Sequence, residues 1–200
     1  MAGNRVKTLR LALWGLVVVV GAVASAMYFF AGPPENTMAD IGGGSYSLVD
    51  HTGQPVDQTM LEGHPSLLFF GFTHCPDVCP TTMADMQYWF SELGDDAKDL
   101  KGYFVTVDPE RDTPELIGGY VSWVSDRMVG ITGTRAEIDK IMGAWYAFGE
   151  KVPLEDGEYT MNHTASVFLV NSDGKFEGTI AYGESSDMAI EKIRKLLAKS

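Results

Sequence analysis

The only two cysteines of the chain, Cys75 and Cys79, are the residues whose type and spacing best suit chemistry. They stand in the string CPDVCP, directly after an apolar run and directly before a helical pattern. The positive end of a helix dipole favours the thiolate, which is the form that binds metals and exchanges disulfides. A spacing of four residues lets both sulfurs reach one metal ion, or each other. The pattern therefore leaves metal binding, thiol–disulfide exchange and a structural disulfide open.

A third metal ligand would have to come from the histidines, because two sulfurs rarely satisfy a metal alone. We interpret His51 and His64 as surface residues. His74 adjoins the site, but its side chain points in a different direction from that of a cysteine one turn later. His163 precedes a predicted strand and is either the third ligand or a surface residue, and Met161 is a candidate for a further sulfur donor. Two thiolates and one imidazole suit copper better than zinc, which usually takes four ligands.

Charged residues near the cysteines and after the second predicted strand are candidates to support the site. Arg111 lies between Asp108 and Asp112, at the carboxyl end of a strand, where the sites of α/β proteins collect. This arrangement predicts an ion pair that holds the loop beneath the metal, with direct ligation of the metal as the alternative. Asp77, between the cysteines, either tunes the site electrostatically or caps the following helix.

The elements that must position these residues follow from hydrophobic periodicity and from turn and cap residues. Strands are predicted at 66–72, 102–108 and 165–170, with a hairpin partner at 175–181. Helices are predicted at 81–93, 113–125, 134–148 and 187–198. This order predicts a layered α/β domain. We expect a parallel sheet in which the chain that leads into 165–170, with His163, approaches the cysteine loop.

An apolar segment at 11–31 contains no charge and a single polar residue. Its length matches the roughly 20 residues that cross a bilayer. Three basic residues precede it and no Lys or Arg follows before Lys98, which predicts an N-terminus that stays inside and an exported remainder. A cleaved signal peptide is the alternative, although its apolar core is usually shorter. We expect a basic flank at 1–10, a flexible tether at 32–45 and one domain at 46–200.

The net charge of −12 argues against a nucleic-acid partner, because such proteins carry a basic surface. Residues 1–31 hold three basic and no acidic residues, so the remainder carries 12 basic against 27 acidic residues, a net charge of −15. The exported part is therefore acidic.

Three strings occur together and in a fixed order: FTHCPDVCP at 72–80, VDPERDTP at 107–114 and HTA at 163–165. On these strings the chain resembles the Sco (SCO1/SenC/PrrC) family of membrane-anchored copper chaperones, over roughly residues 40–198. The resemblance implies a thioredoxin-like fold and one copper, Cu(I) or Cu(II), held by Cys75, Cys79 and His163. It also implies a role in assembling the binuclear copper centre of cytochrome c oxidase subunit II.

The leading hypothesis is a metallochaperone rather than an enzyme, with the tether limiting its search to membrane-anchored acceptors. A second hypothesis is a thiol–disulfide reductase or peroxidase, in which Cys75 attacks and Cys79 resolves. A third is a copper or redox sensor that uses the same residues. Because few residues precede the apolar segment, we expect a bacterial inner membrane with the domain in the periplasm. The alternative is the mitochondrial inner membrane, facing the intermembrane space.

Overall fold

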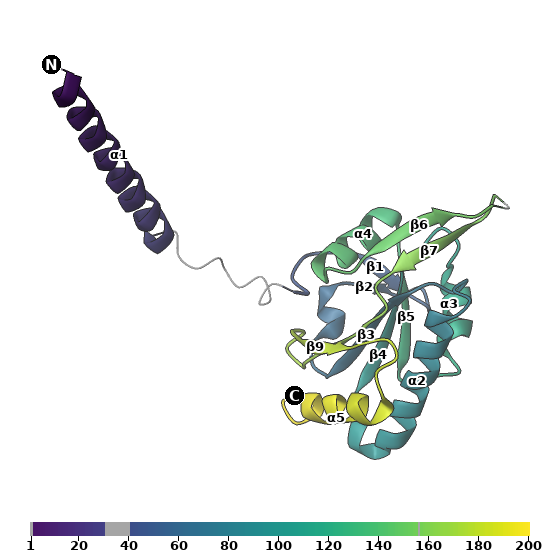
Figure 1. Ribbon diagram of the computed structural model, residues 1–200. Helices are drawn as coiled ribbons and strands as arrows, with labels where there is room; N and C mark the ends of the chain where they lie inside the picture. Colours follow the sequence, from purple (N-terminus) through teal and green to yellow (C-terminus); the bar gives the residue numbers. More distant parts are fainter. Residues whose placement is uncertain (1, 31–40, 156) are drawn as a thin grey trace. The chain divides into compact units, whose positions relative to one another are not determined.

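Figure 1 shows the computed structural model, which describes residues 2–30, 41–155 and 157–200. The chain divides into two units, Met1–Ala39 and Asp40–Ser200. The first unit contains the helix α1 (Ala2–Phe30). Within the described ranges, no helix combines the length and the apolar character that crossing a membrane requires. Most of the tether expected at 32–45 lies outside the described residues.

The second unit is a mixed α/β domain built on a central sheet. Among the described residues, seven strands form this sheet in the order β2-β1-β5-β4-β3-β8-β9. Their bounds are β1 (Leu48–Asp50), β2 (Pro55–Val56), β3 (Ser66–Gly71), β4 (Lys101–Thr106), β5 (Met128–Thr132), β8 (Val167–Val170) and β9 (Phe176–Ile180). Strands β3, β4 and β5 are parallel. All six residues of β3 are buried, as expected for a central strand covered on both faces.

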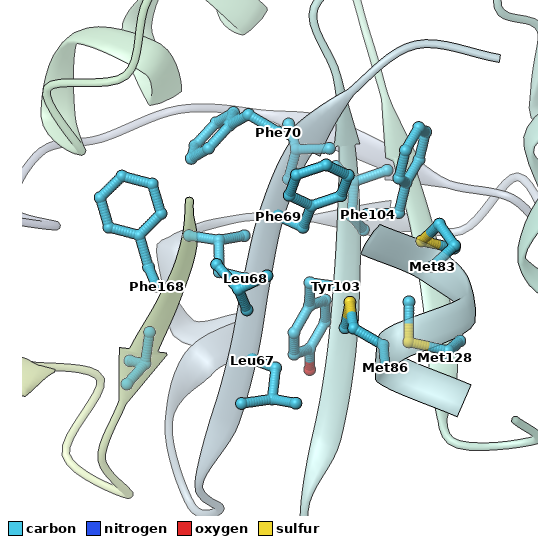
Figure 2. Close-up of a cluster of buried hydrophobic side chains, with 14 of the residues drawn as sticks. Leu67, Leu68, Phe69, Phe70, Met83, Met86, Tyr103, Phe104, Met128 and Phe168 are labelled. Atoms are coloured by element: carbon cyan, nitrogen blue, oxygen red, sulfur yellow. The ribbon is translucent and has the colours of Figure 1, made fainter. Parts of the chain in front are cut away.

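Four helices of the described chain cover the sheet: α2 (Val78–Leu93), α3 (Pro114–Val121), α4 (Arg135–Ala144) and α5 (Ser186–Leu197). Two short 3-10 helices, η1 (Gln58–Leu61) and η2 (Gly94–Ala97), complete the connections. The parallel connections from β3 to β4 and from β4 to β5 run through α2 and α3, and connections of this kind are almost always right-handed, which puts both helices on one face of the sheet. Helix α5 contacts α2. Met83 and Met86 project from α2 into the buried cluster around Phe69 and Phe104 (Figure 2).

Helices α3 and α4 begin where the sequence predicted, whereas α2 begins at Val78 rather than at 81, and two helix ends also differ from the prediction. The hydroxyl of Thr113 accepts the N–H of Leu116 in the first turn of α3, and the hydroxyl of Thr134 accepts the N–H of Glu137 in the first turn of α4. Helix α3 ends at Val121 rather than near 125, and α4 ends at Ala144 rather than near 148. Tyr146 has a positive φ of 51°, a backbone conformation that no α-helix continues through.

Strand β8 runs antiparallel to β3, with Val167 opposite Phe69, so the expectation of a parallel pairing is wrong. The direction matters for the site, because antiparallel neighbours place the start of one strand beside the end of the other. The chain just before β8, which includes His163, therefore lies at the carboxyl end of β3. A parallel strand would begin at the opposite edge of the sheet.

A separate hairpin stands between α4 and β8. Its strands, β6 (Gly149–Pro153) and β7 (Tyr159–His163), pair with each other and not with the main sheet in the described part of the chain. Figure 1 shows the hairpin extending from the domain beside α4. His163 is the last residue of β7, opposite Gly149, so the position of the hairpin decides where this side chain lies.

Candidate metal centre

The loop after β3 and the first turn of α2 bring the two cysteines together. Cys79 is fully buried and Cys75 is partly buried, and both are free thiols in the described structure. The backbone N–H of Cys79 donates to Cys75 Sγ at 3.3 Å, so this sulfur accepts a free N–H at the start of α2. Asp77 occupies the N-cap position of α2, but its side chain makes no capping hydrogen bond. Of its two predicted roles, side-chain capping is therefore wrong.

His163 completes a group of three donor atoms. One ligand atom from each of Cys75, Cys79 and His163 lies within 4.8 Å of the other two. The Nε2 atom of His163 is 3.3 Å from Cys79 Sγ, and its Nδ1 donates to the carbonyl oxygen of Thr164 at 2.9 Å. This pairing makes Nδ1 the protonated nitrogen of the neutral ring, which leaves the Nε2 lone pair facing the sulfurs. The chemistry of the set, two sulfurs and one imidazole, fits a soft metal ion.

Two aromatic rings hold the imidazole from the side of the sheet. The ring of Phe72 meets that of His163 edge-on, with centroids 5.7 Å apart and planes at 81°. Phe69 of β3 makes a similar contact at 6.1 Å and 75°. Both phenylalanines are buried, so they restrict the rotation of the histidine ring without competing for its nitrogens.

The two thiols differ in their affinity for protons. The hydrogen bond from Cys79 lowers the pKa of Cys75 to about 3, with a smaller contribution from His163. The same interaction raises the pKa of Cys79, and burial of its thiol raises it further. The pair therefore shares one proton at neutral pH, with the negative charge on the more accessible sulfur of Cys75.

A pocket of about 230 Å³ opens onto this site between the cysteine loop and β7. Cys75 and His163 line it, together with Asp77 and Met161. Met161 is buried and shares the pocket, so it remains the candidate for a further sulfur donor. Cys79, in contrast, is fully buried.

A buried carboxylate fixes the backbone at the start of the cysteine loop. Asp112 accepts hydrogen bonds from the N–H of Thr73 at 3.0 Å and from its hydroxyl at 2.6 Å. It also accepts the hydroxyl of Thr106, at the end of β4, at 2.6 Å. His74 Nδ1 lies 3.6 Å from the same carboxylate, and its side chain is half exposed. His74 is thus a neighbour of the site and not one of the three clustered donors, as predicted.

The expected ion pair in the second motif is present. Arg111 Nε lies 2.5 Å from Asp108 Oδ2, and Asp108 is fully buried. Asp112 serves Thr73 and Thr106 instead of Arg111, because its carboxylate points toward the cysteine loop. The structural role that the sequence predicted for this motif is confirmed, with the two aspartates acting on different loops.

Two histidines were expected at the surface, and that prediction is wrong for His64, whereas His51 is only partly buried. His64 is buried, and its Nε2 lies 3.0 Å from the hydroxyl of Tyr103 on β4. His51 is partly buried, and its Nδ1 accepts the N–H of Gly130 on β5 at 3.1 Å. Both partners are distant in sequence, so local context gave no signal for either contact.

Sequence reasoning also missed residues that support the site. Thr73 and Thr106 bind Asp112, and Tyr159 of β7 donates to Asp108 at 3.0 Å. The one available signal was Thr106, a polar residue that ends a buried apolar strand. The role of Tyr159 depends on the hairpin, which has no clear strand pattern.

A mixed α/β domain that brings two thiols and an imidazole into contact defines a class of thiol-based metal or redox proteins. Its architecture is consistent with the thioredoxin-like fold expected from the sequence. The SCO1/SenC family profile matches residues 34–198. The chain therefore belongs to the SCO1/SenC family, and the resemblance seen in its three strings is confirmed.

Proteins similar in sequence to this chain include mitochondrial proteins and a bacterial protein. The mitochondrial SCO1 homolog of Homo sapiens is 40% identical over 137 residues, which are 67% of this chain and 46% of that protein. The mitochondrial SCO2 of Saccharomyces cerevisiae is 31% identical over 76% of this chain and 52% of its own length. A SCO2-like protein of Rickettsia felis is 32% identical over 67% of this chain and 66% of its own. The chain thus spans about half the length of the human and yeast relatives.

Solved structures share the fold. ScoI of Bradyrhizobium japonicum, determined with copper bound, is 38% identical and has a TM-score of 0.70 over 77% of this chain and 98% of that one. ScoI of Arabidopsis thaliana, also determined with copper bound, is 28% identical with a TM-score of 0.74 over 79% of this chain and 99% of that one.

Proposed function

We propose that this chain is a copper chaperone that carries one copper ion for the assembly of cytochrome c oxidase. The observation that carries the proposal is the meeting of donor atoms from Cys75, Cys79 and His163 within 4.8 Å. Thiolates and imidazole are ligands that select copper, and Cu(I) is satisfied by three of them. The copper bound in the Bradyrhizobium and Arabidopsis relatives supports the same assignment.

In this proposal copper is cargo, and the protein's residues determine how it is taken up and released. Cys75 already carries the negative charge and is the more accessible sulfur, so it meets an incoming ion first. Cys79 then gives up its proton, and His163 presents its free Nε2. An acceptor thiolate would approach through the pocket that Cys75 and His163 line. Because Cys79 is fully buried, the acceptor would meet the copper from the side of Cys75.

The acceptor in this proposal is cytochrome c oxidase subunit II or another copper-accepting membrane protein. We place the chain in a bacterial inner membrane, anchored by 11–31, with 46–200 in the periplasm behind a tether at 32–45. The uncharged run and its basic flank support this placement. The mitochondrial inner membrane is the alternative. Alkaline extraction of membranes tests the anchor: the full chain should stay in the pellet, whereas recovery in the supernatant would contradict it.

A thiol–disulfide reductase activity is the second candidate function. The specific observation that favours it is the free pair with one stabilised thiolate, Cys75, beside a protonated thiol, Cys79. Attack by the Cys75 thiolate on an acceptor disulfide would form a mixed disulfide, which Cys79 would resolve. Copper-free reduction of a disulfide-bonded acceptor that survives H163A would favour this function over delivery.

A deletion strain distinguishes copper delivery from sensing. We expect loss of oxidase activity, restored by the wild-type gene or by added copper, but not by H163A. The matched control is H74N, because His74 lies beside Cys75 without joining the three donors. Normal oxidase activity in the deletion strain, or full rescue by H163A, would contradict the proposal.

A further inference from the structure

The β6–β7 hairpin carries one of the three donor residues although it is not part of the main sheet. A two-stranded hairpin alone is at best marginally stable in water, so tertiary contacts must fix its position. Side chains two apart on a strand share a face, which places Tyr159, Met161 and His163 of β7 on one side. Met161 is buried and His163 meets Cys79, so this face is the one turned toward the domain.

The far end of this face is held by Tyr159. Its hydroxyl donates to Asp108 Oδ1 at 3.0 Å, and its carbonyl accepts Arg111 Nη1 at 3.0 Å. The guanidinium carbon of Arg111 also lies 3.8 Å from the centroid of the Tyr159 ring. Arg111, which contacts Tyr159, also pairs with the fully buried Asp108, two residues after the end of β4. The residue that holds the hairpin is therefore itself fixed to the domain.

Arg111 also reaches the segment that carries the cysteines. Its guanidinium carbon lies 5.9 Å from the centroid of the Phe72 ring, and Phe72 packs edge-on against His163. One guanidinium therefore contacts the start of β7 and the aromatic ring that supports the histidine at the end of β7. Arg111 therefore links β7, which carries His163, to the segment that leads into the cysteine loop.

We propose that Asp108, Arg111 and Tyr159 form a latch that positions His163 over the two sulfurs. This inference rests on the proposed copper site, and none of the three residues is a ligand. The latch holds the hairpin against the domain, so that His163 is presented to Cys79 before copper arrives. Loosening the latch lets β7 move away, which leaves a two-sulfur site that binds copper more weakly.

Lys151 provides the matched control. Its Nζ lies 4.5 Å from the centroid of the Tyr159 ring, and it pairs with Glu110 at 2.5 Å. Both partners of this ion pair are substantially exposed, so the pair contributes little to stability. K151M thus removes a cation from the same ring and leaves the buried contacts of Asp108 intact.

The test compares Y159L, Y159F and K151M in the full-length chain. Hydrogen exchange of the reduced, copper-free protein should be about tenfold faster in peptides of the hairpin in Y159L, with β3 and β4 unchanged. Y159F, which keeps the ring on Arg111, should fall between Y159L and wild type, and K151M should match wild type.

Copper binding gives the second readout. Competition with a Cu(I) chelator should show about tenfold weaker binding for Y159L, as is common when a group that orients a ligand is lost. X-ray absorption should show the nitrogen ligand weakened or absent. Wild-type exchange and affinity in Y159L, or equal effects in K151M, would overturn the latch. A wild-type protein that binds no copper would refute the proposed function, while the exchange data would still decide whether the latch holds the hairpin.

Discussion

Replacing Gly71 with alanine inserts one methyl group directly beneath the metal site. Gly71 is the last residue of β3, and a Cβ there would lie 2.9 Å from Cys79 Sγ and 2.8 Å from the ring of Phe104. Both neighbours are fully buried, so neither can move into solvent. Ordinary contacts of a Cβ begin near 3.4 Å, so G71A forces the sulfur or the ring to shift.

The cost follows from overpacking a buried site. Such insertions typically destabilise by about 1–3 kcal/mol. For a chain of this length, a loss of 1 kcal/mol lowers Tm by about 2–4 °C. We therefore expect the Tm of G71A to be lower by about 2–12 °C. Because the displaced atom is a donor, Cu(I) affinity should also fall by about tenfold, which corresponds to about 1.4 kcal/mol.

Gly119 offers the matched control. It lies exposed on α3, and a Cβ there would meet no atom within 4 Å. Because alanine is the better helix former by about 1 kcal/mol, G119A should keep or raise Tm and should bind copper like wild type. Unchanged stability and unchanged affinity in G71A would refute the close approach of β3 to Cys79.

Three further predictions concern the thiols and the loops around them. Alkylation of Cys75 in the reduced copper-free chain should be nearly independent of pH from 5 to 8, because its pKa of about 3 keeps it a thiolate; a rate rising about tenfold per pH unit would contradict this. D112N should lower the free energy of unfolding in urea by about 1–3 kcal/mol, because an NH2 group replaces one of the two carboxylate oxygens that together accept the N–H and hydroxyl of Thr73 and the hydroxyl of Thr106; an unchanged midpoint would exclude that role. T113A should lower the free energy of unfolding by about 1 kcal/mol, because it removes the side-chain cap of α3. A Tm equal to that of the wild type would contradict this.

The central part of the fold could be predicted because its signals are local. The apolar runs at β3, β4 and β8 and the turn before β9 are each explained by a few neighbouring residues. The caps Thr113 and Thr134 are also local, since each hydroxyl accepts an N–H three residues later. Short strands such as β1 and β5 were missed because their apolar pattern extends over too few residues.

The hairpin could not be predicted, because its strands carry exposed charged residues and depend on distant partners. β6 reads GEKVP and is mostly exposed, so it shows neither alternation nor an apolar run. The contact that fixes β7, from Tyr159 to Asp108, joins residues 51 positions apart. His163 was found as a candidate by its residue type and by resemblance, whereas the antiparallel start of β8 that brings it to the site was not.

The burial of His64 also could not be predicted from the sequence, because its partner is distant along the chain. A histidine before a proline at the start of a strand predicts a surface position, yet burial here lowers its pKa. Its Nε2 lies 3.0 Å from Tyr103, whose hydroxyl donates to the carbonyl of Met60 at 2.6 Å. A polar side chain enters the interior when such a partner is available, and the partner becomes visible only in three dimensions.

The most direct test of the account is the copper content and coordination of the reduced full-length chain after loading with Cu(I). We predict about one copper per chain, with X-ray absorption showing two sulfur ligands and one nitrogen. C75S and C79S should each lose a sulfur ligand and most of the copper, H163A should lose the nitrogen, and H74N should match wild type. Failure of the wild type to retain copper, or retention with unchanged coordination in H163A, would contradict the account.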